Sequence, residues 1–299
     1  MSSDGVSPRN CVWCGSPFDD SSIRLRGRIA CSACGAATTD PWPDAATLRE
    51  AYARYRPESG RFSGAGDALL RCMRGRLAAR VDRLAPAGPV LDVGAGDGTL
   101  LDALAGHGRE ALGLEPEPRR PDVRDADVTE VEGAWSGIVF WHSLEHLPGP
   151  GRALAHAAGH LRPGGALLVA VPNTSSLQAR AFGDRWFHLD LPRHLVHLPA
   201  AALVERLREH GLCVTRVSHW RGGQALFGWL HGLVGSLPGH PDLYDAIRRP
   251  EARSSPMAPQ RRALALAAGV ALFPFAAVAT AAEIMARRAG TVYVEARHD

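Results

Sequence analysis

The sequence has 299 residues, 45% of them hydrophobic and 22% charged, which is the composition of a folded globular protein and excludes disorder as its main state. Its 34 basic residues, all arginine, nearly balance 31 acidic ones, and a formal net charge of +3 is too small to predict a polyanionic partner. The first ten residues are polar and lack the apolar core that a secretory signal requires, so we expect a cytoplasmic location.

Four of the six cysteines form two closely spaced pairs near the N-terminus. The pairs are Cys11-x2-Cys14 and Cys31-x2-Cys34, separated by sixteen residues, a spacing typical of two turns that share one tetrahedral metal ion. A glycine follows each pair, where a positive φ lets backbone amides approach the sulfurs. Four thiolates leave no open coordination position, so we expect structural zinc in a ribbon over residues 1–40. Four unrelated buried thiols are the alternative.

A helical segment, residues 41–86, connects this ribbon to the rest of the chain. Its tyrosines Tyr52 and Tyr55 lie three residues apart, and they either close over a site as a lid or pack the helix against a sheet. The two remaining cysteines, Cys72 and Cys213, have apolar neighbours and are expected in the core.

A glycine-rich loop joins an apolar run at 89–93 to a helical stretch at 99–105, and the next strand, 111–114, ends in an acid. Glycines let the backbone approach a nucleoside closely, and an acid about twenty residues further on can accept both ribose hydroxyls. The acid before the loop would repel a pyrophosphate but suits the cationic methionine end of S-adenosylmethionine. The candidate cofactor-binding residues are therefore Asp92, Gly94, Ala95, Gly96, Gly98 and Glu115.

This D-x-G-x-G-x-G pattern resembles the class I S-adenosylmethionine-dependent methyltransferases, over about residues 88–220 and again at 290–298. The resemblance implies an α/β fold, with a Rossmann-like seven-stranded sheet whose core is 87–220 and whose last strand lies in 290–299. It also places Asp127 near the adenine. Ser136 stands where the family usually has aspartate, and three prolines between Glu115 and Val123 leave little room for the usual second helix.

The candidate catalytic residues follow the fourth and fifth strands, because ligands bind at the carboxyl edge of such sheets. Trp135–Phe140 resembles the fourth strand, and Glu145 and His146 follow it in a segment that resembles the family's LEH motif. We favour His146 as the base that deprotonates the acceptor, and a capping or cofactor-shell role is the alternative. A second cluster follows the fifth strand and contains Trp186, His188, Asp190, Arg193, His194 and His197. It resembles a stretch found in zinc-ribbon relatives, and His194 is therefore the second candidate base.

Residues 221–289 form an insertion between the sixth and seventh strands, with apolar stretches at Ala225–Leu237 and Ala263–Ala282. The second is long enough for one membrane crossing, but the flanking strands must pair in one sheet, which favours half-insertions or an interfacial hairpin. Arginines on both sides suit anionic headgroups at the inner face of the membrane. A hairpin packed on the domain or in a homodimer interface is the alternative.

The main interpretation is methyl transfer to oxygen or carbon of a small-molecule or lipid-linked acceptor. The chain resembles the zinc-ribbon sugar C-methyltransferases at its N-terminus and the quinone-pathway O-methyltransferases in its central motifs, so the acceptor is a sugar or a quinone-type ring. One alternative is an RNA methyltransferase, disfavoured because the ribbon lacks an arginine cluster interleaved with aromatics. Another is a catalytically silent interaction protein that binds the cofactor.

Overall fold

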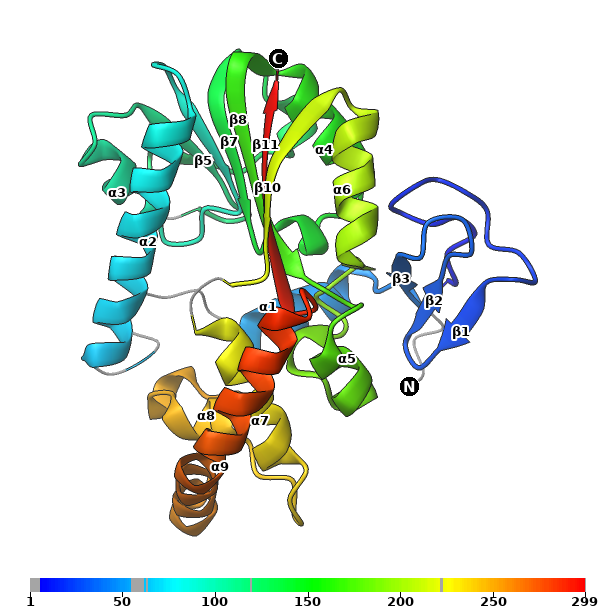
Figure 1. The fold of residues 1–299 in the computed structure, drawn as a ribbon, viewed down its shortest axis with the longest axis vertical. Helices are drawn as coiled ribbons and strands as arrows, with labels where there is room; N and C mark the ends of the chain where they lie inside the picture. The colour runs from blue at the N-terminus through cyan, green and yellow to red at the C-terminus, as the bar shows by residue number, and fades with distance from the viewer. Residues whose placement is uncertain (1–5, 55–61, 63, 119, 221–222, 299) are drawn as a thin grey trace.

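The computed structural model describes the chain except residues 1–5, 55–61, 63, 119, 221–222 and 299. A seven-stranded sheet lies at its centre, with helices on both faces, a small sheet to one side and a helical insertion below (Figure 1). In spatial order the strands of the central sheet are β10 (Leu212–Ser218), β11 (Thr291–His298), β8 (Leu161–Pro172), β7 (Trp135–Trp141), β4 (Val90–Val93), β5 (Ala111–Leu114) and β6 (Val123–Arg124). The predicted Rossmann-like seven-stranded fold is confirmed.

The inner strands are apolar on both faces because helices cover the sheet on each side. Along β8, Leu167 and Val169 pack with one core, whereas Ala166 and Leu168 alternate into the other. The first core is covered by α4 (Pro150–Gly159) and α6 (Ala200–Glu209), and the second by α2 (Ala65–Leu84) and α3 (Thr99–Ala105). The strands β4, β5, β6, β7 and β8 are parallel, and β11 enters antiparallel between β8 and β10.

The N-terminal ribbon is built into the main domain. Its strands β1 (Ile23–Leu25), β2 (Arg28–Ala30) and β3 (Ala37–Thr39) are joined by β9 (Val196–His197), which comes from the central domain. Cys11 and Trp13 pack in the same core as α4 and α6, and Arg206 of α6 donates to the Trp13 carbonyl at 3.1 Å. The ribbon therefore shares both a sheet and a core with the rest of the protein.

The connecting helix α1 (Ala45–Arg54) follows the ribbon, and the described residues between β5 and β6 form no helix, as the prolines there predict. The expectation that Cys72 and Cys213 are core residues was wrong, because both are exposed. Cys72 lies on the solvent side of α2, and Cys213 lies in β10, which is an edge strand with an open face.

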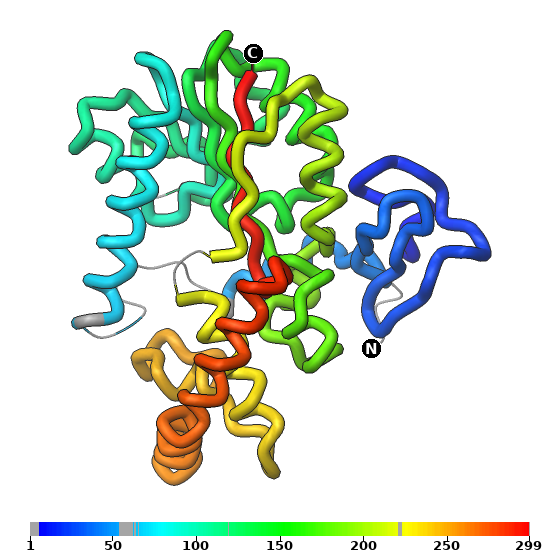
Figure 2. The backbone as a smooth tube through the Cα atoms, viewed as in Figure 1, coloured from blue at the N-terminus to red at the C-terminus, as the bar shows by residue number. Residues whose placement is uncertain are grey.

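The insertion leaves the end of β10 and returns to the start of β11, as the chain trace shows (Figure 2). It consists of α7 (Gln224–Gly235), α8 (Leu243–Ile247) and α9 (Pro259–Met285), which share a small core of their own. Because β10 runs parallel to β8, the insertion lies at the carboxyl edge of the sheet. The predicted hydrophobic helical insertion is confirmed.

Candidate functional site

The glycine loop after β4 adopts a conformation that requires glycine. Gly94, Gly96 and Gly98 have φ angles of 81°, 58° and 76°. A β-carbon at Gly94 would lie 2.3 Å from the Ser143 Cβ, so a larger residue would collide with the chain beyond β7. The Gly96 amide donates to the Glu115 carboxylate at 3.0 Å, which fixes that acid beside the loop. The structure thus brings the predicted loop and its distal acid together.

Two carboxyl groups beside the loop are protonated more readily than usual. Asp92 in β4 is 2% exposed, and burial raises its pKa to about 7. Burial also raises the pKa of Glu115, opposed in part by the hydrogen bond from Gly96. A bound cation would stabilise the ionised form of both groups, so this acid pair fits the positively charged S-adenosylmethionine. The individual roles of these residues in cofactor binding stay predictions.

The adjoining residues support the same edge of the sheet. Ala95 is buried, and its amide donates to the Leu114 carbonyl at 2.9 Å. Asp127 lies just beyond β6, where its carboxylate caps a 3-10 turn by accepting from the Thr129 amide at 2.8 Å. Its contact with adenine stays a prediction.

The turn after β7 holds a buried acid. Leu144–His146 forms a 3-10 turn, and His142 before it has a φ of 56°, a left-handed conformation that is uncommon for non-glycine residues. Glu145 is 2% exposed, and neither carboxylate oxygen has a hydrogen-bond partner among the described residues. The His142 Nδ1 lies 3.5 Å from Glu145 Oε1, and the two groups form an ion pair when the imidazole is protonated.

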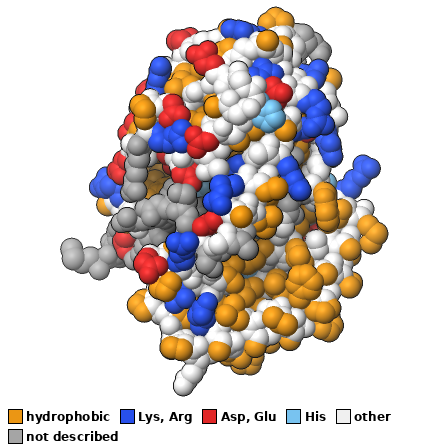
Figure 3. All heavy atoms as spheres, turned by 90° about the vertical axis from the view of Figure 1, so that its left-hand side faces the viewer, with side chains coloured by type: hydrophobic (Ala, Val, Ile, Leu, Met, Phe, Trp, Pro, Cys, Tyr) orange, Lys and Arg blue, Asp and Glu red, His pale blue; other side chains and the backbone are white. Residues whose placement is uncertain are grey.

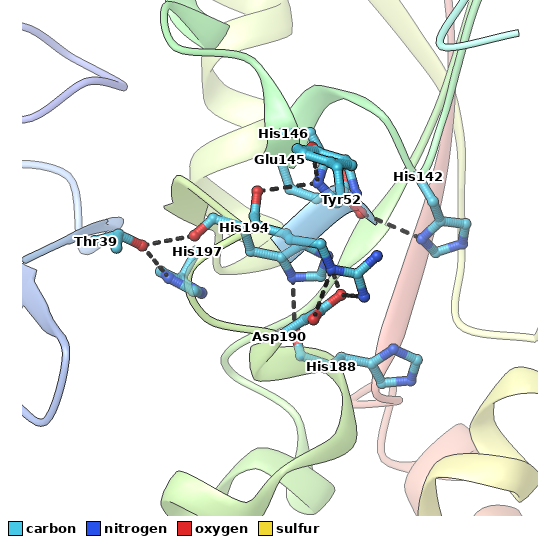
Figure 4. Close-up of polar contacts among 10 residues, drawn as sticks. Thr39, Tyr52, His142, Glu145, His146, His188, Asp190, His194 and His197 are labelled. Carbon is cyan, nitrogen blue, oxygen red and sulfur yellow. Dashed lines mark hydrogen bonds and ion pairs between the residues drawn. The ribbon is translucent and has the colours of Figure 1, made fainter. Parts of the chain in front are cut away.

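The hydrogen bonds of His146 define its tautomer. Its Nδ1 lies 3.0 Å from the Arg193 carbonyl oxygen and 3.1 Å from the Tyr52 hydroxyl (Figure 4). A carbonyl oxygen can only accept, so Nδ1 carries the hydrogen and Nε2 keeps its lone pair. The structure therefore leaves one basic nitrogen on His146.

His194 reaches the same place from the loop after β8. Its Nδ1 donates to the His188 carbonyl at 2.9 Å, which again leaves the Nε2 lone pair, and its ring centroid lies 4.7 Å from that of His146. Burial, and then the neighbouring His146, holds the pKa of His194 well below its usual value. His194 is therefore neutral, and His146, which is only partly buried, is the stronger candidate base.

Two groups of side chains are placed to hold a metal ion. The ligand atoms of Glu145, His146 and His194 lie within 4.8 Å of one another, and the four ribbon cysteines meet the same condition. In the ribbon, Cys11–Cys34 and Cys14–Cys31 are each 3.7 Å apart between sulfurs. Zinc–sulfur bonds of about 2.3 Å in a tetrahedron require sulfurs about 3.8 Å apart, so the ribbon geometry fits zinc.

The residues of the second cluster, Trp186–His197, lie in two places. Asp190 lies at the site, where its carboxylate pairs with Arg193. His197 instead points to the ribbon and lies 3.1 Å from the Thr39 hydroxyl, and Trp186 donates to the Gln178 side chain at 3.3 Å. These two side chains therefore contact Thr39 and Gln178 rather than His146, and β9 places His197 in the ribbon sheet.

Tyr52 is a site residue whose role the sequence left open. It comes from α1 and contacts His146, and burial raises the pKa of its hydroxyl. Its partner in the prediction, Tyr55, lies outside the described residues. The lid alternative requires Tyr52 to cover the site, and its contact with His146 agrees with that requirement.

Comparison with known proteins decides the reaction class. Residues 69–217 match the family model described as "Methyltransferase domain". The chain is an S-adenosylmethionine-dependent methyltransferase. A curated relative, the ubiquinone biosynthesis O-methyltransferase of Xanthomonas axonopodis pv. citri (strain 306), is 29% identical over 161 residues, covering 46% of this methyltransferase and 67% of the relative.

Solved structures resemble this methyltransferase more distantly. A SAM-dependent methyltransferase from Archaeoglobus fulgidus is 17% identical, with a TM-score of 0.46 over 75% of this chain and 94% of that one. The [4+2]-cyclase SpnF is 21% identical, with a TM-score of 0.45 over 81% of this chain and 85% of that one.

Proposed function

We propose that this methyltransferase transfers the methyl group of S-adenosylmethionine to an oxygen or carbon nucleophile of a small-molecule or lipid-linked acceptor, a sugar or a quinone-type ring. The observation that carries the proposal is the cluster of Glu145, His146 and His194. Glu145 and His146 follow β7, the strand that pairs with β4 before the cofactor loop. A nucleophile bound there would meet a basic imidazole nitrogen and a methyl donor at one edge of the sheet.

The reaction requires little beyond orientation and removal of one proton. The acceptor oxygen or carbon attacks the methyl carbon in line, the carbon–sulfur bond breaks, and its electron pair leaves on sulfur as a neutral thioether. The proton of the acceptor passes to His146 Nε2, and the carbonyl of Arg193 stabilises the resulting imidazolium through Nδ1. Bound S-adenosylmethionine supplies the methyl group.

The acceptor class rests on two supports. The curated relative is named as an O-methyltransferase of ubiquinone biosynthesis. The insertion at the carboxyl edge exposes a large apolar surface, which suits a lipid-linked or amphipathic acceptor. We infer a cytoplasmic enzyme that works at the inner face of the membrane.

We also propose that the four cysteines of the ribbon bind one structural zinc ion. The sulfur distances fit a tetrahedron, and all four positions are thiols, which leaves no place for a catalytic water. Metal analysis of the purified protein should give one equivalent of zinc that is lost in Cys14→Ser.

The test of the function is transfer of radiolabelled methyl groups to fractionated cell extract. Label is expected in lipid or in small sugar or ring compounds, and His146→Gln should reduce the initial rate at least a hundredfold while cofactor affinity changes less than threefold. The matched control is His107→Gln, a half-exposed histidine beyond α3. Label that enters only RNA, or cofactor binding without any labelled acceptor, would contradict the proposal.

A further inference from the structure

The outer face of α9 is apolar along its length. The sequence from Ala263 to Ala282 contains no charged residue. Large hydrophobic side chains project from the exposed side of the helix, and Val270 and Val278 among them are 78% and 71% exposed. We call this set the apolar ridge; it consists of Leu264, Val270, Phe273, Phe275, Val278 and Met285.

The fully buried apolar residues of α9 are small. Ala265, Ala268, Gly269 and Ala276 are buried, and the helix packs through this face against α7 and α8. An ordinary surface helix buries its large apolar residues and exposes polar ones. In α9, Leu266 and Leu272 do pack against the core of the insertion, but the other buried apolar residues are small and the six large apolar residues of the ridge face solvent. Packing within the described chain therefore does not account for the ridge.

The space-filling view shows how far the apolar surface extends. Hydrophobic side chains gather over the lower part of the molecule, where Figure 1 places α7 to α9, whereas charged side chains are scattered over the upper part (Figure 3). The exposed apolar surface is therefore concentrated at the end of the molecule that the insertion forms.

Charge at the ends of α9 indicates what covers the ridge. Arg261 before the apolar run and Arg287 after it are exposed. The acidic residue of α9, Glu283, is fully buried and accepts hydrogen bonds from Gln178 and Trp229, so it adds no exposed negative charge. Apolar side chains flanked by arginines complement a bilayer with anionic headgroups, because the arginines remain at the headgroups when the ridge enters the acyl boundary.

The topology decides how the helix meets the membrane. β10 and β11 pair antiparallel in one sheet, so both ends of the insertion return to the same side. α9 has 27 residues and is about 40 Å long, but α7 has only 12, too few for a return crossing. One crossing would separate two paired strands, which favours a helix that lies along the interface over one that crosses it.

The inner side of the insertion contacts the loop that carries the site. The ring centroid of Phe187, on that loop, lies 5.2 Å from Phe227 of α7 and 5.3 Å from Tyr244 of α8. Gln178, in α5 (Leu177–Phe182), donates to Glu283 of α9 at 2.8 Å. The ridge is thus tied to the chain segment between β8 and His194.

We propose that the apolar ridge docks α9 on the surface of a bilayer rich in anionic phospholipid, with the carboxyl edge of the sheet next to the membrane. This inference deepens the proposed function, because it rests on a lipid-linked or amphipathic acceptor and names the surface from which that acceptor enters. The membrane contact itself depends only on the ridge and its arginines.

The test is sedimentation of the full-length protein with vesicles. Vesicles of phosphatidylcholine alone are compared with vesicles containing one quarter phosphatidylglycerol. The wild-type protein should sediment with the anionic vesicles, and 0.5 M salt should weaken the binding. The double variant Val270→Asp/Val278→Asp should bind at least tenfold less, and Arg261→Glu/Arg287→Glu should lose the preference for anionic lipid.

The control is Ile23→Asp, which places the same charge at a 62% exposed apolar residue of the ribbon and should leave vesicle binding unchanged. Calorimetry with S-adenosylmethionine is run on every variant, because the ridge variants should keep cofactor affinity. Wild-type protein that stays in solution at all lipid concentrations overturns the inference. A second result also overturns it: the wild-type protein is a dimer that does not bind vesicles, and the Val270→Asp/Val278→Asp variant is a monomer. The ridge would then be a homodimer interface. If the wild-type protein binds vesicles but does not bind S-adenosylmethionine, the proposed function is contradicted and the membrane contact is supported.

Discussion

The Thr39 hydroxyl, at the end of the ribbon's last strand, donates a 2.6 Å hydrogen bond to the carbonyl of His194 in the candidate active site. The same hydroxyl lies 3.1 Å from His197 Nε2, which must donate because the hydroxyl hydrogen is already used. The Thr39 amide also donates to the Leu195 carbonyl at 3.1 Å. One ribbon residue therefore fixes the backbone at the second candidate base and at the residue that follows it.

Thr39→Val should separate this positioning from folding. Valine keeps the shape of threonine but leaves the His194 carbonyl and the His197 ring nitrogen unpaired in a buried place. We expect the turnover rate to fall about tenfold, with cofactor affinity unchanged. The control is Thr38→Val, which removes a bond to the Val12 amide inside the ribbon. Equal losses in both variants would assign the effect to ribbon stability rather than to the position of His194.

Removal of the zinc proposed for the ribbon should reduce methyl transfer at the candidate active site. Without the metal the cysteine turns lose the ion that fixes them, and the pairing of β3 with β9 (Ala37 with His197, Thr38 with Val196) should weaken. A chelator that extracts the metal should therefore abolish most methyl transfer while cofactor affinity stays within about threefold. Hydrogen exchange at residues 194–198 should rise in parallel. Unchanged exchange there would show that the ribbon does not hold the loop.

The sequence predicted the parts of the fold that local pattern controls. The helix Thr99–Ala105 and the strand Ala111–Leu114 agree with the structure residue for residue, because apolar periodicity and the glycine loop mark their ends. The pairing of β3 with β9 was beyond such reasoning, since β9 has two residues and the pair Thr39–His197 is separated by 158 positions. The prediction for Cys213 was wrong for a related reason. Apolar neighbours indicate a strand but do not indicate that the strand lies at the edge of a sheet.

The candidate catalytic residues that the sequence analysis named lie in contiguous motifs. Glu145 and His146 follow a recognisable strand, and His194 lies in a motif with its own resemblance. For Tyr52 the sequence left a lid and packing against the sheet as alternatives, because nothing in a helical segment indicates which distant side chain it will contact. Its bond to His146 depends on the packing of α1 below the sheet.

Cofactor affinity should depend on pH through Asp92. Its pKa in the free protein is about 7, raised by burial, and a cationic ligand favours the ionised form. Affinity should therefore rise with pH, by about tenfold per unit below pH 7, and level off above it, with protons released on binding. Calorimetry in two buffers of different ionisation enthalpy measures that release. Asp92→Asn should flatten the profile to the shallower dependence that Glu115 contributes, and a pH-independent wild type would show that Asp92 does not face the bound cation.

Glu115 provides the sharpest test of the cofactor pocket, because its carboxylate has two roles at once. It accepts from the Gly96 amide at 3.0 Å, and the resemblance assigns it to the ribose hydroxyls. Glu115→Gln keeps an oxygen that can accept from Gly96, so the loop should stay in place and the melting temperature should change little. The amide is a weaker acceptor for the two hydroxyls, and S-adenosylmethionine should bind at least tenfold less tightly, equivalent to about 1.4 kcal/mol. Glu117→Gln, an exposed acid two residues further on, is the control and should bind normally. If the affinity survives Glu115→Gln while Glu115→Ala destabilises the fold, the carboxylate serves the loop alone and the ribose must be held elsewhere.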